Sequence, residues 1–172
     1  MPGFGPGAAT VSGTTARLRV ATYNIHRCRG WDQRVLPSRI ARVLEEVDAD
    51  IIALQEVVNH TLSPEQPGQA CYLAKQLGYE CRFGQTRQLR GRPYGNAVLS
   101  RFPIKTTRSY DLSCELLEPR ACFQVDIEVS ERQSLHIFNV HLGTTHSERG
   151  RQARALVSTQ ILNSPDLRHP RV

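Results

Sequence analysis

Two short apolar runs, each followed by polar side chains, set the pattern of this chain. Residues 51–54 form an unbroken apolar stretch that is too short for a helix and rich in β-branched residues, and it leads into Glu56. The run over 18–26 has the same form and ends in Asn24 and His26. Continuous apolar runs of this length are typical of strands that are buried on both faces of a sheet.

The segment between these runs is predicted to be a helix that begins near Pro37, a residue suited to the first helical turn. Apolar residues then recur at helical spacing, at Ile40, Val43, Leu44 and Val47. A strand, a helix and a second strand form a β-α-β unit. Because ligands of open α/β sheets bind outside the carboxyl ends of the strands, Asn24 and Glu56 should face one crevice.

The remainder of the chain predicts short strands joined by tight turns, with two further helices. One helix should start at the sequence Ser63-Pro64-Glu65 and end at Gly78, and the last should be capped by Ser147 and run to Ile161. A basic exposed loop is predicted over 85–93. Closely spaced strands favour antiparallel pairing in a mixed sheet with helices on one face, so the fold class is α/β. The strands are predicted at 79–84, 96–100, 104–112, 121–129 and 135–142.

Composition and charge fit one soluble globular domain. The chain has 172 residues, of which 40% are hydrophobic and 22% are charged. Residues 1–17 are mostly small and are predicted to form a disordered tail, which leaves 18–172 as the domain. The formal charge of 22 − 16 = +6 favours anionic partners such as phosphates, nucleic acids or acidic headgroups.

The cysteines and the lack of long apolar stretches indicate a cytoplasmic protein. Five scattered cysteines without a C-x-x-C spacing suit reduced thiols better than a disulfide framework or a zinc site. No apolar stretch approaches the ~20 residues of a membrane span. The first 13 residues lack the basic and apolar regions of a signal peptide.

Two strand ends carry the strongest candidate chemistry. Glu56 and Asn24 offer carboxylate and amide oxygens, the ligands that Mg²⁺ prefers while keeping several waters, although Glu56 could equally cap a helix or pair with an arginine. His141 also lies at a predicted strand end. Its imidazole is either a structural hydrogen-bonding group or a donor to a phosphate oxygen.

Other polar residues allow both structural and functional interpretations. Arg120, at the start of a strand, is either a surface arginine or a guanidinium fork on a phosphate. Asn96 follows a glycine and suits a turn as well as a site. The arginines over 87–92 are either solvated charge or contacts to a phosphate backbone.

Four segments and Gln152, taken together, resemble the endonuclease/exonuclease/phosphatase (DNase I-like) superfamily of metal-dependent phosphoesterases. The segments are Thr22-Tyr23-Asn24-Ile25-His26, the stretch 50–57 ending in Leu54-Gln55-Glu56-Val57, the stretch 95–104 containing Asn96-Ala97-Val98-Leu99-Ser100-Arg101, and Asn139-Val140-His141-Leu142-Gly143. The resemblance covers roughly residues 18–162. It implies a DNase I-like α/β sandwich of mixed sheets flanked by helices.

The resemblance also implies roles for individual residues. Glu56 would be the metal ligand and Asn24 a ligand or phosphate contact, with Mg²⁺, or Mn²⁺, as the cofactor. His141 would bind the scissile phosphate, Arg120 would clamp a phosphate, and Asn96 would lie on the substrate side. The reaction implied is the attack of water on phosphorus, with the metal polarising the phosphoryl oxygens.

The chain lacks the motifs that the family carries in the last third of its domain. Neither an Asp-x-Asn strand end nor a Ser-Asp-His triplet is present, although these supply the water-orienting aspartate and the Asp-His pair. The resemblance therefore predicts a domain with only its first two-thirds. The absent part would supply the second half of the sandwich, so the sheet built from 18–142 should expose an apolar face and promote self-association.

Three functional interpretations remain open. The first is phosphodiester hydrolysis by lineage, inactive or weak in this chain. The second is a non-catalytic module that binds phosphate or nucleic acid, and the third is an enzyme completed by a partner chain. The sequence does not separate nucleic acids, phospholipid headgroups and small phosphoesters as substrates.

Overall fold

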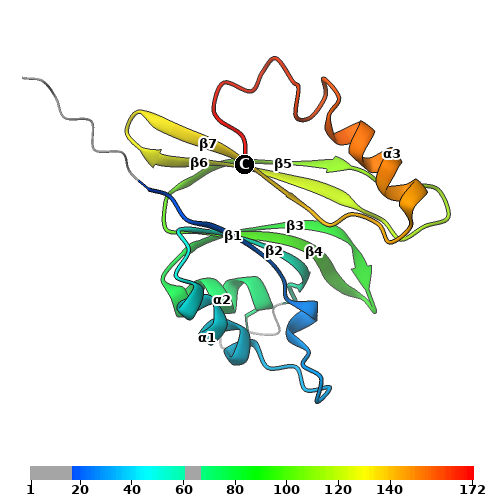
Figure 1. Cartoon of the computed structure of the whole chain (residues 1–172). Helices are drawn as coiled ribbons and strands as arrows, with labels where there is room; N and C mark the ends of the chain where they lie inside the picture. The colour runs from blue at the N-terminus through cyan, green and yellow to red at the C-terminus, as the bar shows by residue number, and fades with distance from the viewer. Residues whose placement is uncertain (1–16, 61–66) are drawn as a thin grey trace, which may run out of the picture.

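The computed structural model describes residues 17–60 and 67–172. The elements in chain order are β1 (Val20–Asn24), the short 3-10 helix η1 (His26–Cys28), α1 (Pro37–Val47), β2 (Ile51–Val58), α2 (Gln69–Leu77), β3 (Glu80–Leu89), β4 (Arg92–Ser100), β5 (Ile104–Asp111), β6 (Ala121–Ser130), β7 (Gln133–Val140) and α3 (His146–Leu156). They form two stacked sheets, with α1 and α2 outside the first sheet and α3 outside the second (Figure 1). The predicted α/β sandwich is confirmed.

The first sheet has the strand order β1-β2-β4-β3. β1 and β2 are parallel, with Asn24 opposite Gln55, which confirms the predicted β-α-β unit. β4 pairs antiparallel with both β2 and β3. Because β1 and β2 run in the same direction, the polar residues that end them lie at one edge of the sheet.

The second sheet, β5-β6-β7, is antiparallel and covers the first. Ile51 and Val98 of the first sheet pack against Phe123, Val125 and Ile137 of the second. The expected exposed apolar face is therefore wrong for the described residues, because the antiparallel run from β5 to β7 folds back over the first sheet. Both layers come from within the first 140 residues, and the predicted self-association loses its basis in an exposed sheet.

The last residues of the chain extend the second sheet. The backbone amide of His136 donates to the carbonyl of Pro170 at 2.9 Å, and that of Phe138 donates to the carbonyl of Val172 at 2.8 Å. Arg171 lies opposite His136 in a parallel bridge. Residues 170–172 therefore pair with β7.

The helix α1 buries a narrower stripe than its sequence predicts. Ile40 and Leu44 are buried against the first sheet, but Val43 and Val47 are 38% and 40% exposed. The correction has a geometric reason, because α1 packs on α2 and joins the core of the first sheet through Ile40, Ala41 and Leu44, and Val43 and Val47 are not part of that core. Ala41 fills part of the contact instead.

Two other predicted boundaries are corrected. The expected basic loop over 85–93 is a β-hairpin, in which β3 continues to Leu89 and the chain turns at Arg90 and Gly91. The φ of +73° at Gly91 suits that turn, since glycine has no Cβ to clash there. The last helix is capped by Thr145, whose Oγ1 accepts a hydrogen bond from the Glu148 amide at 3.3 Å.

That helix also ends earlier than expected. α3 stops at Leu156, and Ile161 is buried by the turns that follow it. The helix α2 ends before Gly78 as predicted. The predicted cap at Ser63 and the predicted tail, apart from Arg17, lie outside the described residues. Among the helices of the described segments, none has the length and apolar character needed to cross a bilayer.

Candidate active site

Glu56 is held in an unusual backbone conformation at the end of β2. The pairing of β2 with β4 shifts register between Leu54 and Val57, so Glu56 lies in a β-bulge. Its φ is +57°, a left-handed conformation that glutamate rarely adopts. The carboxylate Oε1 accepts a hydrogen bond from Asn24 Nδ2 at 2.9 Å. The bulge thus turns the carboxylate toward the end of β1, as expected for a functional site.

A left-handed turn after β1 brings a histidine and an arginine to the same carboxylate. His26 and Arg27, in η1, also have positive φ values. His26 Nδ1 lies 3.3 Å from Glu56 Oε2, and Arg27 Nε lies 3.9 Å from it. The sequence marked His26 only as a polar strand end and assigned no role to Arg27. The signal available in the sequence was an arginine, Arg27, close after the end of an apolar strand.

Arg120 is buried beside two further charged residues. Its side chain is 6% exposed, and Nη2 donates to Glu118 Oε2 at 2.8 Å. Arg87 forms an ion pair with the same carboxylate and stacks over the Tyr94 ring, 4.5 Å from the ring centroid. The Nε of Arg120 is buried and has no hydrogen-bond partner within the described residues. A buried donor without a partner is costly, and a bound anion would satisfy it.

His141 lies just beyond β7 and is held neutral near pH 7. Burial lowers the pKa of His141 below the ordinary value of 6.5, and the nearby Arg120 charge lowers it further. Glu56 and Glu118 oppose this shift. Charges on both sheets therefore act on one imidazole.

The same group of charges surrounds Tyr94. Burial raises the pKa of Tyr94 to about 12, and the Glu56 and Glu118 charges add to this effect. Tyr94, Asn96, Arg120 and His141 border a narrow cavity of about 10 Å³, which has room for about one water molecule.

Buried amides fix the two halves of the site relative to each other. Asn139 of β7 donates to the carbonyls of Leu54 and Ala97 at 2.9 and 2.8 Å. Its Oδ1 accepts from Gln55 Nε2 at 2.7 Å. Asn96 Nδ2 donates to the carbonyl of Asn139 at 3.3 Å, so the predicted substrate-side residue also ties the two sheets together. These contacts join the sheet that carries Glu56 to the sheet that carries His141.

Gln152 positions the loop that follows His141. Its Oε1 accepts from the Gly143 amide at 2.8 Å, and its Nε2 donates to the Leu112 carbonyl at 3.3 Å. Glu148 fills the space where a Cβ at Gly143 would lie. The family-like Gln152 therefore has a structural reason for its place in α3.

The donor set at Glu56 fits a weakly ligated divalent cation. Within the described segments, no group of three or more His, Cys, Asp or Glu side chains could hold a metal ion. Asn24 contacts the Glu56 carboxylate through Nδ2, while its Oδ1 accepts a hydrogen bond from the His26 amide at 2.9 Å, and the Glu56 side chain is 18% exposed. Mg²⁺ commonly binds through one or two carboxylates while retaining water. The pair therefore suits Mg²⁺ better than a fully protein-ligated metal.

All five residues predicted from the sequence lie near this edge of the sandwich. Asn24 and Glu56 are in contact, and Asn96, Arg120 and His141 border one cavity. The Glu56 charge also favours the protonated form of His141 and so opposes the lowering of its pKa. Arg87, Glu118 and Tyr94 complete the charged surroundings. A contact to a phosphate backbone was one of the two interpretations of Arg87, whereas Glu118 was not predicted as a site residue.

Known proteins are similar to most of this chain in sequence or in fold. The uncharacterized protein YbhP of Escherichia coli is 29% identical over 158 residues, which cover 87% of this chain and 62% of YbhP. An endonuclease/exonuclease/phosphatase from Beutenbergia cavernae is similar in structure, with a TM-score of 0.69, 27% identity, and coverage of 81% of this chain and 43% of that one.

A family protein from Leptotrichia buccalis has a TM-score of 0.65 at 20% identity, covering 89% of this chain and 63% of that one. The chain thus spans less than two thirds of the length of these relatives. The model of the Endonuclease/Exonuclease/phosphatase family matches residues 21–172. The chain therefore belongs to the endonuclease/exonuclease/phosphatase family.

Proposed function

We propose that the site hydrolyses a phosphoester bond with the help of a divalent cation, Mg²⁺ or Mn²⁺. The observation that carries this proposal is the buried Arg120, with its unpartnered Nε, beside a neutral His141 and near the bulged Glu56. Membership of the family supports the same reaction class. A phosphate placed here would meet cationic and neutral donors together with a carboxylate suited to a metal ion.

Each side chain has a role that follows from its chemistry. Glu56 and Asn24 would hold the cation, which when bound polarises the phosphoryl oxygens. The Arg120 guanidinium would neutralise charge on the phosphate. Neutral His141 would donate a hydrogen bond to a non-bridging oxygen, where negative charge grows as the bond breaks. Asn96 would face the substrate through the narrow cavity that it borders.

A non-catalytic module that binds phosphate or nucleic acid is the second candidate. The sequence given has no Asp-x-Asn or Ser-Asp-His motif, so no described residue is assigned as the base that activates water. A partner chain that supplies such groups is a variant of the same idea. The hydrolase, the binding module and the enzyme completed by a partner chain all use the same phosphate-binding residues. They differ in whether, and with which groups, the bound phosphoester is hydrolysed.

Hydrolysis of bis-p-nitrophenyl phosphate tests the proposal. The purified chain is assayed with Mg²⁺, with Mn²⁺ and with EDTA. We expect metal-dependent release of nitrophenol that falls by roughly 100-fold or more in Glu56→Gln, because one stabilising group at a reacting centre is worth about that factor. Glu45→Gln, on the exposed side of α1, is the matched control and should keep full activity.

The other outcomes separate the candidates. A folded chain that binds inorganic phosphate, loses that binding in Arg120→Gln and shows no turnover would support the binding module. Metal-dependent turnover that survives unchanged in Glu56→Gln would contradict the assignment of Glu56.

The chemistry of the thiols supports a reducing compartment such as the cytoplasm. All five cysteines are free thiols in the described structure. Detection of the protein in cell fractions that retain reduced thiols would agree with this location.

A further inference from the structure

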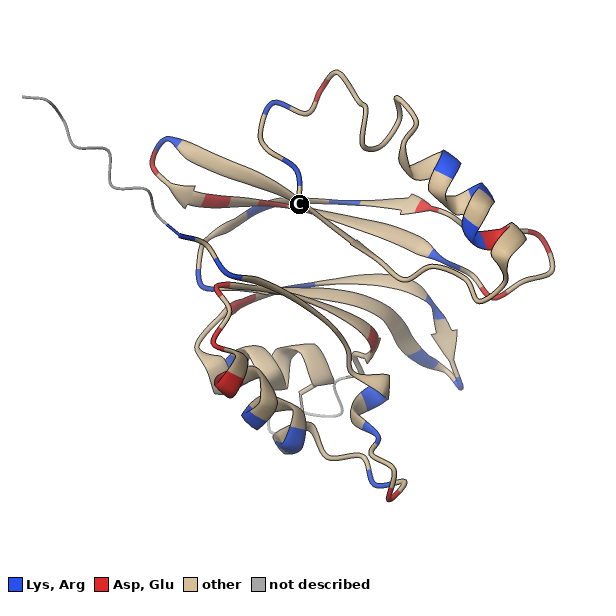
Figure 2. Ribbon diagram, viewed as in Figure 1, with Lys and Arg blue, Asp and Glu red and all other residues tan. Residues whose placement is uncertain are grey.

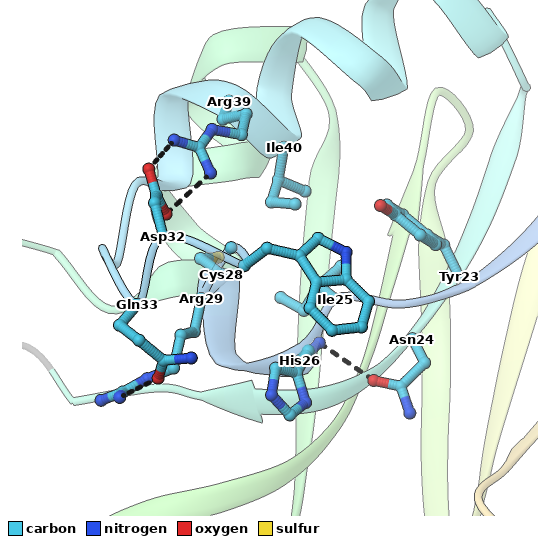
Figure 3. A pocket seen from close by; sticks show the side chains of 12 residues that line it. Tyr23, Asn24, Ile25, His26, Cys28, Arg29, Asp32, Gln33, Arg39 and Ile40 are labelled. Carbon is cyan, nitrogen blue, oxygen red and sulfur yellow. Dashed lines mark hydrogen bonds and ion pairs between the residues drawn. The ribbon is translucent and has the colours of Figure 1, made fainter.

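A large pocket opens directly beside Glu56. Its volume is about 760 Å³, and its lining includes Tyr23, Asn24, His26 and Trp31. Asn24 and His26 also contact the Glu56 carboxylate, so the pocket and the candidate active site share two side chains. Figure 3 shows the Tyr23 ring at one side of the pocket and the Asn24 amide and His26 ring along its edge.

Trp31 gives this pocket an aromatic surface that the fold does not cover. Its side chain is 103% exposed, and it is the one tryptophan in the sequence. The loop that carries it is held by the Asp32–Arg39 ion pair at 2.8 Å (Figure 3) and by a hydrogen bond from the Gly30 amide to the Arg34 carbonyl at 3.0 Å. A tethered loop that leaves an indole fully exposed presents a face for another planar ring.

An arginine-rich pocket lies on the other side of His26. Its volume is about 490 Å³, and it shares His26, Arg29 and Gln33 with the first pocket. Its lining adds Arg27 of η1 and Arg90 and Arg92 of the β3–β4 hairpin. Figure 2 shows basic ribbon at both of these places.

Most of this positive charge is not neutralised within the fold. Arg27 Nε lies 3.9 Å from Glu56 Oε2, whereas Arg90 and Arg92 form no ion pair among the residues that the structure describes. The carboxylate of Glu56 is already in contact with Asn24 and His26. The arginine-rich pocket therefore attracts anions.

We propose that the two pockets form one groove for a single-stranded nucleic acid. A base stacks on Trp31 in the first pocket, and backbone phosphates lie among the arginines of the second. Aromatic stacking beside a basic track is how proteins bind single strands with little sequence preference. The proposal rests on the proposed function, because the strand would deliver a phosphodiester to the Glu56 site.

The surroundings of Trp31 favour a nucleic acid over a membrane surface. Charged or polar residues, including Arg29, Asp32 and Gln33, flank it within three positions, and it borders a recessed pocket. An interfacial anchor needs a broader apolar face. A phospholipid headgroup would also leave the indole without a planar partner.

Tryptophan fluorescence tests the proposal without any turnover. The full chain is titrated in EDTA with an eight-nucleotide oligothymidylate, and with ribose 5-phosphate as the ligand without a base. Because Trp31 is the sole tryptophan, we expect quenching by the oligonucleotide and little change with ribose 5-phosphate. Binding should weaken steeply with salt, as it does when arginines replace the counterions of phosphates.

Matched variants assign the two pockets. Followed by anisotropy of a labelled oligonucleotide, Trp31→Ala should weaken binding about tenfold or more, and Trp31→Phe should restore most of it. Leu116→Ala, at another fully exposed apolar side chain, should have no effect. The double variant Arg90→Gln/Arg92→Gln should flatten the salt dependence, unlike Arg42→Gln on the exposed side of α1.

Several results would overturn the groove. Unchanged affinity in Trp31→Ala would remove the stacking role, and a fluorescence response to phosphatidylglycerol vesicles but not to the oligonucleotide would indicate a membrane surface. Trp31-dependent binding without metal-dependent hydrolysis would leave the groove intact and contradict only the proposed reaction. Metal-dependent hydrolysis together with oligonucleotide binding that does not depend on Trp31 would contradict the groove and leave the proposed reaction intact.

Discussion

At the scale of single residues, the site depends on side chains whose environments differ from water. Glu56 has a left-handed backbone that its bulge imposes, at a cost of about 1–3 kcal/mol for such residues. Arg120 is buried with one donor unpaired, and His141 has a lowered pKa. Strain, an unpaired donor and a shifted pKa at one place are typical of functional sites.

The pKa of His141 gives a pH prediction. We expect its NMR titration midpoint to lie below 6.5, because burial and the Arg120 charge both disfavour the imidazolium. The unfolded chain then binds the proton more readily than the folded chain. This histidine's contribution to stability is therefore complete above pH 6.5 and is lost as the pH falls from there through the lowered pKa.

Charge variants test the cause of that shift. Arg120→Gln should raise the midpoint of His141, Arg120→Lys should leave it near the wild-type value, and Glu118→Gln should lower it, since Glu118 opposes the shift. A midpoint that does not respond to Arg120→Gln would show that the Arg120 charge does not contribute to the lowered pKa.

At the scale of elements, the central feature is the amide network between β2, β4 and β7. Asn139 is 1% exposed, and its side chain contacts β2 and β4 of the first sheet as well as the Gln55 amide. Polar residues at the strand ends in the sequence do not give the register between the two sheets, so these hydrogen-bond partners are decided only by how the sheets stack. They hold Glu56 and His141 in one site.

Removal of Asn139 should therefore destabilise the whole sandwich. We expect Asn139→Ala to lower the free energy of unfolding by about 3 kcal/mol, because each buried polar group left unpaired costs about 1–3 kcal/mol. Urea denaturation measures this change. Asn163→Ala removes one exposed hydrogen bond to the Val157 carbonyl and should cost less than about 1 kcal/mol. Equal effects of the two variants would contradict the bridging role.

At the scale of the whole molecule, packing on the outer faces of the two sheets separates hindered thiols from an exposed one. Burial raises the pKa of Cys28, Cys81 and Cys122 to about 12 in each case, whereas Cys71 is exposed on α2. At pH 8 the thiolate fraction of these three groups is about a thousandfold below that of an ordinary thiol.

Thiol labelling checks the packing of the molecule. With a disulfide reagent at pH 8, Cys71 should react first, and Cys71→Ser should remove this fast phase. The thiols of Cys28, Cys81 and Cys122 should react fully only in denaturant. Rapid labelling of Cys28 or Cys122 in the native protein would show that the helices and turns covering the outer faces of the sheets open readily.

The sequence by itself determined the elements near the site and most of the candidate chemistry. Apolar runs and a proline at the helix start predicted β1, α1 and β2, because local periodicity and backbone preference act over a few residues. The polar strand ends predicted Asn24 and Glu56 for the same reason. Hairpin extent and the boundaries of α3 were less accurate, since pairing partners and packing decide where those elements end.

Only the tertiary structure decided how distant segments meet. The return of β5 to β7 over the first sheet, the bulge at Glu56 and the bridge through Asn139 each depend on contacts between residues far apart in the chain. The burial of Arg120 and the shared pockets beside His26 are further consequences of that packing. Local pattern fixes which residues end a strand, and long-range packing fixes what those residues face.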